Sequence, residues 1–244
     1  MVETLNNSDV ERALVITAHP DDIDFGAAGT IASWTEQGIS VSYCICTNGD
    51  AGGFDPTVPR HEIPLIRQHE QRAAAKAVGV NDVHFLGYTD GALEPTLDLR
   101  RDISRVIRQV RPQRVVCQNP ERAWDFSLHS TYTNHPDHLA AGEAALRAVY
   151  PDSRNPFAFP ELLREGHEEW VIDEVWVMTT DSPNHSVDIT NTFDKKLAAL
   201  CAHESQVSHI DPEAMLRRIA DHSCELMKVD KGQLIEVFRV LPTS

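Results

Sequence analysis

The sequence predicts a Rossmann-like α/β fold, in which a mostly parallel sheet lies between two layers of helices, a three-layer α/β/α arrangement. Short β-branched runs alternate with segments of helical period through the first half of the chain. Strands that alternate with helices form parallel sheets through right-handed crossovers. Hydrophobic residues make up 41% of the 244 residues, enough for a sizeable core. No change in composition marks a linker, so we expect a single domain over residues 1–244.

The first half of the chain, up to Tyr150, alternates strands with helices. The strands are short runs rich in β-branched residues, and we place them at 12–18, 39–47, 83–87 and within 111–118. The helices have apolar residues at helical spacing, and we place them at 25–38, between Pro64 and Gly79, at 96–110 and at 136–150. Residues 48–60 are rich in glycine and proline and are expected to form a loop.

The second half is less regular, because residues 151–166 contain three prolines. Apolar runs predict strands, and we place them at 170–180, 186–190 and 234–241. Two further segments of helical period predict helices, at 194–206 and 211–228.

Composition excludes several classes of partner. The net charge is −15 and no basic cluster interrupts it, so nucleic acid and anionic membranes would be repelled. No apolar run approaches the roughly 18 residues that a membrane helix needs. Residues 1–13 lack the basic start and apolar stretch of a signal peptide, so the cytoplasm is the expected compartment. Five sparse cysteines argue against a disulfide framework, and Cys44 and Cys46 are expected to be buried on one face of a strand.

Two polar clusters follow two expected strands. The first is His19-Pro20-Asp21-Asp22, directly after the strand at 12–18, and the second is His135-Pro136-Asp137-His138, at the end of the loop after the fourth strand. Open α/β sheets bind ligands beyond the carboxyl ends of the strands, where strand order reverses. In the order 3-2-1-4-5 the reversal lies between the first and fourth strands. The fold class therefore brings the two clusters together.

The residue types suit a metal site with acid–base groups beside it. His19, Asp22 and His138 would supply two nitrogens and one oxygen, which leaves a fourth position of a catalytic zinc for water. Asp21 and His135 then remain for proton transfer. The alternative is structural: an Asp-Asp pair after a strand commonly caps a helix, and Asp22 or Asp24 could cap the following helix.

The two clusters also carry a family resemblance. HPDD at 19–22, followed by a Gly-x-x-Gly-Thr pattern at 26–30 and by HPDH at 135–138, resembles the PIG-L/LmbE family of zinc-dependent N-deacetylases. Similar segments continue from about residue 12 to 210, among them "FLGYTDGAL" and "KKLAALCAHESQ". The resemblance implies an LmbE-like fold. It also implies hydrolysis of an N-acetyl group on an N-acetylglucosamine-containing small molecule or glycoconjugate.

The resemblance also implies roles for the two clusters. His19, Asp22 and His138 match metal ligands, for zinc or another divalent transition metal such as Fe²⁺. Asp21 matches the general base, and His135 matches the group that stabilises the oxyanion or protonates the leaving amine.

Three further positions match family residues. Asp137 matches an aspartate that supports a neighbouring histidine, and Arg67 matches an arginine that contacts substrate in some members. His203 matches a histidine without an assigned role. A mobile tyrosine of some members is replaced by Thr133, with Tyr132 beside it.

Alternatives to deacetylation remain at this stage. A family amidase that cleaves a larger acyl group or a thiol conjugate of the mycothiol type is the main one, and a metal-dependent phosphoesterase and a non-catalytic binding module are others. A dinucleotide-binding enzyme would need G-x-G-x-x-G after the first strand, where HPDD stands. Family members range from monomers to hexamers, so a homo-oligomer is an open expectation.

Overall fold

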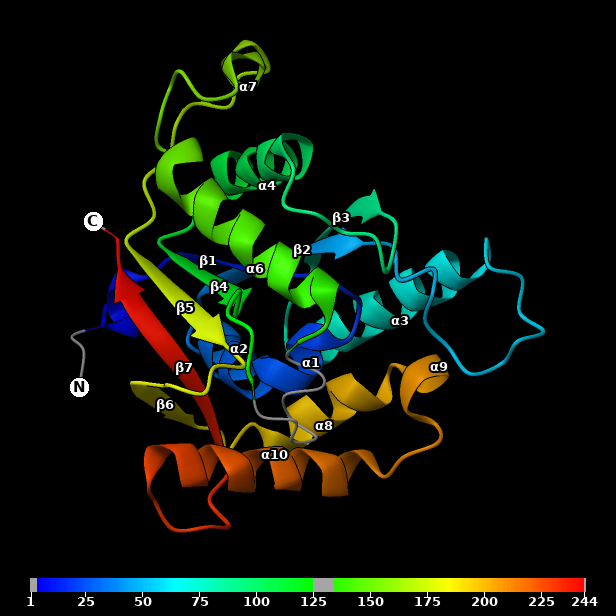
Figure 1. The fold of residues 1–244 in the computed structure, drawn as a ribbon. Coiled ribbons are helices and arrows are strands. Elements are labelled where there is room, and N and C mark those ends of the chain that lie inside the picture. Colours follow the sequence, from blue (N-terminus) through cyan, green and yellow to red (C-terminus); the bar gives the residue numbers. More distant parts are fainter. Residues whose placement is uncertain (1–3, 125–133, 244) are drawn as a thin grey trace.

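The structure is a computed structural model, and it describes residues 4–124 and 134–243 (Figure 1). Its strands are β1 (Arg12–Thr17), β2 (Ser40–Thr47), β3 (Asp82–Tyr88), β4 (Arg114–Gln118), β5 (Glu174–Met178), β6 (His185–Asp188) and β7 (Ile235–Pro242). Its longer helices are α2 (Ala28–Glu36), α3 (Ile63–Ala77), α4 (Leu97–Val110), α6 (Pro136–Arg147), α8 (Phe193–Cys201) and α10 (Pro212–Met227). Its short helical segments are η1 (Asn7–Asp9), α1 (Asp22–Gly26), η2 (Ala148–Asp152), α7 (Pro160–Arg164) and α9 (Glu204–Val207).

Within the described ranges, the strands form one sheet in the order β3-β2-β1-β4-β5-β7-β6. The strands from β3 to β5 pair in parallel, whereas β7 pairs antiparallel with β5 and β6. The order 3-2-1-4-5 and the mostly parallel sheet confirm the predicted fold class. Strand order reverses between β1 and β4, and the carboxyl ends of both strands lie at the same edge.

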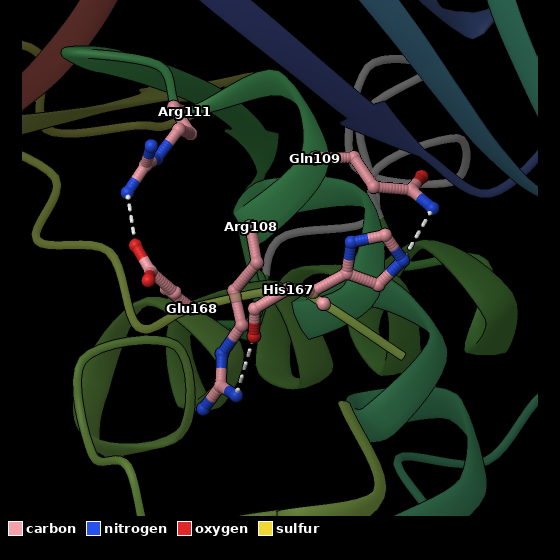
Figure 2. A pocket seen from close by; sticks show the side chains of 6 residues that line it. Arg108, Gln109, Arg111, His167 and Glu168 are labelled. Atoms are coloured by element: carbon pink, nitrogen blue, oxygen red, sulfur yellow. Dashed lines mark hydrogen bonds and ion pairs between the residues drawn. The ribbon is translucent and has the colours of Figure 1, made fainter. Parts of the chain in front are cut away.

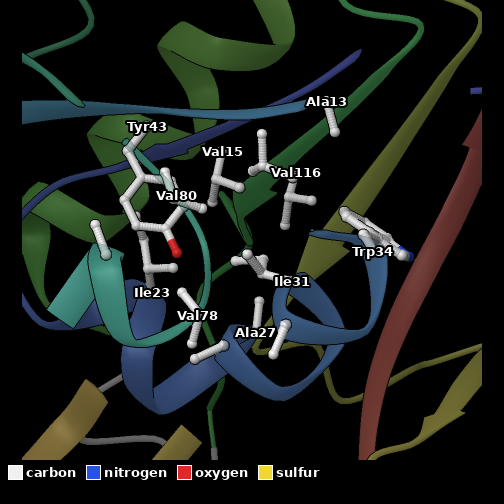
Figure 3. Close-up of a cluster of buried hydrophobic side chains, with 14 of the residues drawn as sticks. Ala13, Val15, Ile23, Ala27, Ile31, Trp34, Tyr43, Val78, Val80 and Val116 are labelled. Atoms are coloured by element: carbon white, nitrogen blue, oxygen red, sulfur yellow. The ribbon is translucent and has the colours of Figure 1, made fainter. Parts of the chain in front are cut away.

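Each central strand is buried on both faces, as parallel sheets require. Along β1, Ala13 and Val15 contact one core cluster, whereas Leu14 and Ile16 contact another. The first cluster joins the sheet to α1, α2 and α3 and is shown in Figure 3. The second joins the sheet to α4 and α6, which lie on the opposite face in Figure 1. The sheet is therefore the middle of three layers.

The cysteines follow the expectation for β2. Cys44 and Cys46 are both free, fully buried and packed in the second cluster. Burial raises the pKa of the Cys44 thiol to about 12. These thiols therefore act as small apolar side chains of the core.

The helix predicted at 25–38 begins earlier and is broken. The structure has α1 and α2 in its place, separated at Ala27, whose backbone leaves helical geometry (φ −144°, ψ 0°). The carboxylate of Glu236, on β7, accepts the backbone N–H groups of Gly29 and Thr30 at 3.0 and 2.7 Å. A buried carboxylate at the start of α2 satisfies donors that the break would leave unpaired. The ammonium of Lys196 pairs with Glu236 in turn.

Other boundaries differ by smaller amounts. The helix expected at 194–206 is divided into α8 and α9 around His203, and α6 ends at Arg147 before the short η2 turn. The strand expected at 170–180 is limited to β5. Among the described helices, none combines the length and apolar character that a membrane crossing requires.

Candidate active site

The carboxyl ends of β1, β2 and β4 are tied together by hydrogen bonds. The backbone N–H of Thr47 donates to the carbonyl oxygen of Ala18 at 2.8 Å. The N–H of Ala18 donates to Oε1 of Gln118 at 2.8 Å. His19 is the next residue and is 7% exposed. The first polar cluster therefore starts from a fixed point at the reversal of strand order, where the fold class predicts it.

Asp21 and Asp22 follow in a sharp turn. Asp21 has φ 94° and ψ −30°, a conformation that side-chain-bearing residues rarely adopt. Its side chain stands at the N-cap of α1 but makes no capping hydrogen bond. Asp22 opens α1, and its Oδ2 accepts the backbone N–H of His19 at 2.7 Å. Asp21 is therefore not a helix cap, and its conformation needs another explanation.

The second cluster opens α6. His135 is the N-cap residue, and its Nδ1 accepts the backbone N–H of Asp137 at 3.2 Å. The carboxylate of Asp137 is fully buried and accepts the backbone N–H groups of Gly91 and Leu93 at 2.7 and 3.1 Å. The loop after β3 is thereby joined to the start of α6.

A glycine lets α6 approach the end of β4. A Cβ atom at Gly142 would lie 2.4 Å from the backbone carbonyl oxygen of Gln118, closer than real Cβ atoms approach backbone. The second cluster therefore reaches the crevice because position 142 has no side chain.

Three side chains from the two clusters, His19, Asp22 and His138, form a compact triangle through four donor atoms, because Asp22 contributes both of its carboxylate oxygens. Nδ1 of His19 lies 3.1 Å from Nε2 of His138. Nε2 of His138 lies 3.0 Å from Oδ1 of Asp22, and Oδ2 of Asp22 lies 3.4 Å from Nδ1 of His19. Four-coordinate zinc at its usual bond lengths of about 2.0–2.1 Å separates neighbouring ligand atoms by about 3.3 Å. The spacing of the two nitrogens and of the nearer Asp22 oxygens is therefore close to that of ligands on a tetrahedral metal ion, with a different oxygen of Asp22 near each histidine.

Among the described residues, two groups have ligand atoms that all lie within 4.8 Å of one another, His19 with His135 and His138, and His19 with Asp90 and Asp137. Neither group contains Asp22. In the second group, Nε2 of His19 lies 3.1 Å from Asp90 and 3.2 Å from Asp137. The oxygens of Asp137 already accept backbone N–H groups. Asp137 and Asp90 are therefore better placed to accept a hydrogen bond from Nε2 of His19 than to bind a metal ion. A metal-binding histidine commonly donates its other ring N–H to a carboxylate, and that arrangement leaves Nδ1 of His19 for the triangle.

The supporting role implied for Asp137 stays a prediction, and the histidine that its carboxylate contacts, His19, belongs to the other cluster. Only the backbone N–H of Asp137 contacts His135.

The carboxylates at the site favour a positive charge there. Burial acts to raise the pKa of Asp22, but His138 and His19 hold that pKa well below its usual range. Burial acts to lower the pKa of His19, but Asp22, Asp137 and Asp90 raise it well above its usual value. A proton or a divalent cation would satisfy the same negative groups.

Asp21 and His135 have the properties of a base and a neutral donor. Burial raises the pKa of Asp21 in spite of its contact with Arg67. Burial and the neighbouring His19 and His138 lower the pKa of His135, so its imidazole is neutral at neutral pH. Since Nδ1 of His135 accepts a hydrogen bond, the ring proton is on Nε2, which can donate.

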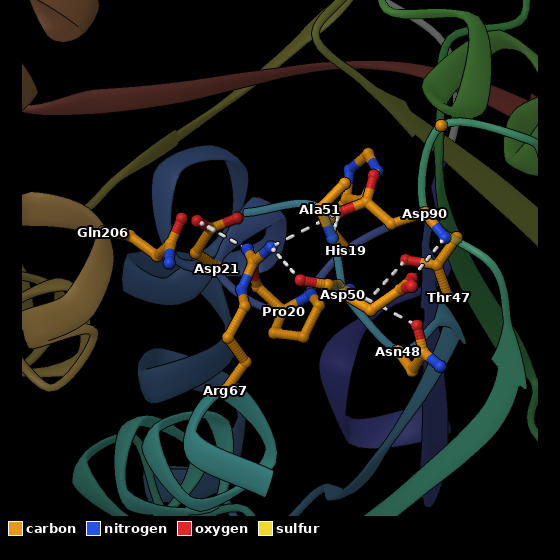
Figure 4. A network of polar contacts seen from close by, with 12 residues as sticks. His19, Pro20, Asp21, Thr47, Asn48, Asp50, Ala51, Arg67, Asp90 and Gln206 are labelled. Atoms are coloured by element: carbon orange, nitrogen blue, oxygen red, sulfur yellow. Dashed lines mark hydrogen bonds and ion pairs between the residues drawn. The ribbon is translucent and has the colours of Figure 1, made fainter. Parts of the chain in front are cut away.

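Arg67, on α3, contacts the turn that contains Pro20 and Asp21 (Figure 4). Its guanidinium donates to the carbonyl oxygens of Pro20 and Gly49 and to Oδ2 of Asp21, the last at 3.1 Å. Asp90 lies 3.7 Å from the same guanidinium. Arg67 is 3% exposed. These contacts hold Asp21 and Asp90, and direct contact of Arg67 with substrate stays a prediction.

Sequence reasoning missed Gln71 and Asp90, considered Asp24 only as a possible helix cap, and gave His203 no role. The side chains of all four are largely shielded from solvent, and each is joined to the first cluster by a direct or an indirect hydrogen bond. Asp90 had a usable signal, because it follows β3 at the same edge of the sheet. Gln71 and Asp24 had none, since each has its partner on another element.

The glycine-rich segment 48–60, expected to form a loop, lies next to the site. A hollow of about 300 Å³ is lined by the loop from Asp50 to Val58, with Arg60 and Ile63. Oδ2 of Asp50 accepts a hydrogen bond from Arg60 at 2.8 Å, and Oδ1 accepts the backbone N–H of Asp90 at 2.9 Å. The hollow is therefore joined to the site through Asp90. In the loop after β4, Trp124 is 81% exposed, and Tyr132 and Thr133 lie outside the described residues.

Another hollow lies far from this edge, at the end of α4 (Figure 2). Its polar side chains pair with one another: Gln109 with His167 at 3.1 Å, and Arg111 with Glu168 at 3.3 Å. It offers no group of ligands or nucleophiles comparable with the first site.

Comparison with known proteins shows which family the chain belongs to. The family model "PIG-L: GlcNAc-PI de-N-acetylase" matches residues 14–149, a range that contains both polar clusters.

Relatives and solved structures extend the match. The chain is 36% identical to a diacetylchitobiose deacetylase of Thermococcus kodakarensis, over 82% of this chain and 71% of the relative. It is also 36% identical to a probable N-acetyl-alpha-D-glucosaminyl L-malate deacetylase 2 of Bacillus cereus, over 84% and 86% of the two chains. Among solved structures, the N,N'-diacetylchitobiose deacetylase of Pyrococcus horikoshii, complexed with its inhibitor MPG, matches with a TM-score of 0.86 and 30% identity, over 97% of this chain and 85% of that chain. The chain therefore belongs to the PIG-L family of de-N-acetylases.

Proposed function

We propose that the chain is a zinc-dependent N-deacetylase that hydrolyses the acetamide of an N-acetylglucosamine-containing small molecule to a free amine and acetate. The relatives, whose names give deacetylation of diacetylchitobiose and of N-acetylglucosaminyl malate, support the reaction class. The observation that carries the proposal is the triangle of His19, Asp22 and His138 with Asp21 at its side.

In this proposal His19, Asp22 and His138 hold the metal ion through Nδ1, a carboxylate oxygen and Nε2. Zinc, or another divalent transition metal such as Fe²⁺, supplies Lewis-acid chemistry: it polarises an acyl oxygen and lowers the pKa of water. Asp137 and Asp90 orient His19 by accepting the hydrogen of its Nε2.

Asp21 is the proposed general base. Its Oδ2 is paired with Arg67, so Oδ1 is left to take a proton from the attacking water. The raised pKa makes this carboxylate a better base than a free aspartate. The same oxygen can then return the proton to the departing amine.

His135 is the proposed donor to the oxyanion. Its neutral ring carries the hydrogen on Nε2, so it can donate to the negative oxygen that forms when water adds to the acetamide carbon. The N-cap position at the start of α6 fixes the ring before substrate binds.

Charge at the rim favours an uncharged aglycone over an anionic one. Asp50, Asp55 and Asp90 lie along the glycine-rich loop and its neighbour, and Arg60 is paired with Asp50. Arg67 is committed to Asp21 and its surroundings. We therefore favour a neutral saccharide, as in diacetylchitobiose, over a malate conjugate.

The test is release of free amine from a panel of acylated amines by zinc-loaded protein. The panel contains N,N'-diacetylchitobiose, N-acetylglucosaminyl malate, a matched N-butyryl glucosamine and a mycothiol-type thiol conjugate. We expect the highest kcat/KM with the acetylated neutral disaccharide. Preference for the longer acyl group or for the thiol conjugate would favour the amidase alternative, and no amine release from any member would refute the proposal.

A further inference from the structure

The conformation of Asp21 needs support from its surroundings. Its φ of 94° lies where residues with a Cβ atom are strained, and α1 begins at the next residue. A glycine would relieve this strain but would remove the carboxylate. The residues that hold the backbone of Asp21 therefore decide where the proposed base points.

One side chain holds that backbone directly. Oε1 of Gln71, on α3, accepts the backbone N–H of Asp21 at 2.9 Å. The same amide donates through Nε2 to Oδ2 of Asp24 at 3.1 Å. Gln71 and Asp24 are both completely buried. Because one partner needs an acceptor and the other a donor, the amide has a single orientation.

His203 extends this chain to a third part of the fold. Its ring, also completely buried, lies between α8 and α9, and its Nε2 is 2.8 Å from Oδ2 of Asp24. This pair joins residues that are 179 positions apart in the sequence. Oδ2 of Asp24 thus accepts from Gln71 and from His203 at once, which fixes both side chains.

The hydrogen-bonded series of His203, Asp24 and Gln71 costs more free energy to bury than apolar side chains would. Apolar side chains would fill the same space without desolvating a carboxylate, an amide and an imidazole. Oδ1 of Asp24 and Nδ1 of His203 have no hydrogen-bond partner among the described residues, which adds to that cost. In return, the hydrogen bonds that Asp24 makes with Gln71 and His203 fix Oε1 of Gln71 as the acceptor for the backbone N–H of Asp21.

Arg67 holds the other end of the same residue, since its guanidinium pairs with the Asp21 carboxylate at 3.1 Å. The two supports come from one helix, α3, one turn apart. Asp21 is thereby held at its backbone by Gln71 and at its side chain by Arg67.

We propose that His203, Asp24 and Gln71 are positioning residues for the proposed general base Asp21. They act through the chain His203 Nε2, Asp24 Oδ2, Gln71 amide and Asp21 N–H, and none of them touches the substrate. The inference rests on the proposed function for its kinetic consequence, while its structural part concerns the Asp21 backbone alone.

The test compares matched variants. Gln71→Met keeps the length of the side chain and removes both hydrogen bonds, and His203→Leu removes the donor to Asp24. His203→Gln returns a donor near the position of Nε2. Ser205→Ala is the control, because Ser205 lies in the same segment and its hydroxyl bonds to Glu70 and Gln206, which are not members of the proposed hydrogen-bonded series.

The readouts are bound metal, kcat, KM, and exchange of the Asp21 amide hydrogen by NMR. We expect Gln71→Met and His203→Leu to lower kcat about 10- to 100-fold, as small misplacements of catalytic groups do. KM should stay within about twofold and bound metal unchanged, with His203→Gln recovering most of the loss. In Gln71→Met, the Asp21 amide should exchange at least about tenfold faster than in the parent protein, since its acceptor is gone.

The inference is overturned if both variants keep kcat near that of Ser205→Ala, or if His203→Gln recovers nothing over His203→Leu. If the parent protein hydrolyses none of the panel substrates, the proposed function fails separately. In that case amide exchange alone decides the positioning, and unchanged exchange of Asp21 in Gln71→Met refutes it. Should Gln71→Met fail to fold, the comparison of His203→Leu with His203→Gln decides the inference, with Ser205→Ala as the control.

Discussion

Nδ1 of His19 and Nε2 of His138 lie 3.1 Å apart, although the two residues are 119 positions apart in the sequence. Two ring nitrogens at this distance must share a proton or a metal ion, because two lone pairs would repel each other. Asp22 stands within 3.4 Å of both. The contact is a product of the fold, since it joins His19, two residues after β1, to the first turn of α6 at the reversal of strand order.

Replacement of a ligand should remove the metal. We expect His138→Ala to bind much less zinc than one equivalent per chain, because only His19 and Asp22 of the three proposed ligands remain. The measurement is metal content after dialysis against buffered zinc. His135→Ala is the matched control, and it should keep its metal. Equal metal content in the two variants would contradict the assignment of His138.

His135→Ala should lose turnover while it keeps its metal. Removal of one oxyanion donor costs about 10²–10³ in kcat in other enzymes, and we expect a loss in that range. Steady-state kinetics on zinc-loaded variant protein measures it. A kcat within twofold of the parent would show that His135 has no such role.

Asp21→Asn should also keep its metal and lose turnover. The amide has the size of the carboxylate but cannot take a proton, and general-base catalysis contributes about 10²–10⁴-fold. Asp98→Asn is the control, because that exposed carboxylate lies on α4 away from the site. Retention of activity in Asp21→Asn would mean that another group takes the proton.

Gly142→Ala should destabilise the fold. The added methyl group would meet the backbone oxygen of Gln118 at 2.4 Å, which a side-chain rotation cannot relieve. We expect a loss of about 1–3 kcal/mol in the free energy of unfolding, as for other overpacked sites. Denaturant unfolding measures it. On the same helix, Glu143→Ala should change stability by no more than about 0.5 kcal/mol, and equal effects of the two substitutions would contradict the packing argument.

The sequence predicts the strand order and the two polar clusters of this site, but not the buried residues that hold those clusters in place. Alternation of strands with helices sets the order of β3, β2, β1, β4 and β5, and this order places His19 beside His138. The local pattern of residues is sufficient for that step.

The supports depend on partners that no local pattern reveals. The break at Ala27 follows from a carboxylate on the last strand, Glu236, which meets the start of α2. Asp24 resembles a helix cap in the sequence, but in the structure it accepts hydrogen bonds from Gln71 and His203. Such pairings arise from tertiary packing, which overrides local propensity.

Reconstitution with metal tests the central claim most directly. The protein is freed of metal by chelation, and release of amine from N,N'-diacetylchitobiose is followed as zinc is added back. The account predicts no activity without metal and a rise that ends at one equivalent of zinc per chain, with acetate and amine formed in equal amounts. Full activity in the metal-free protein would contradict it, and so would zinc-loaded protein that releases no amine from any acylated substrate.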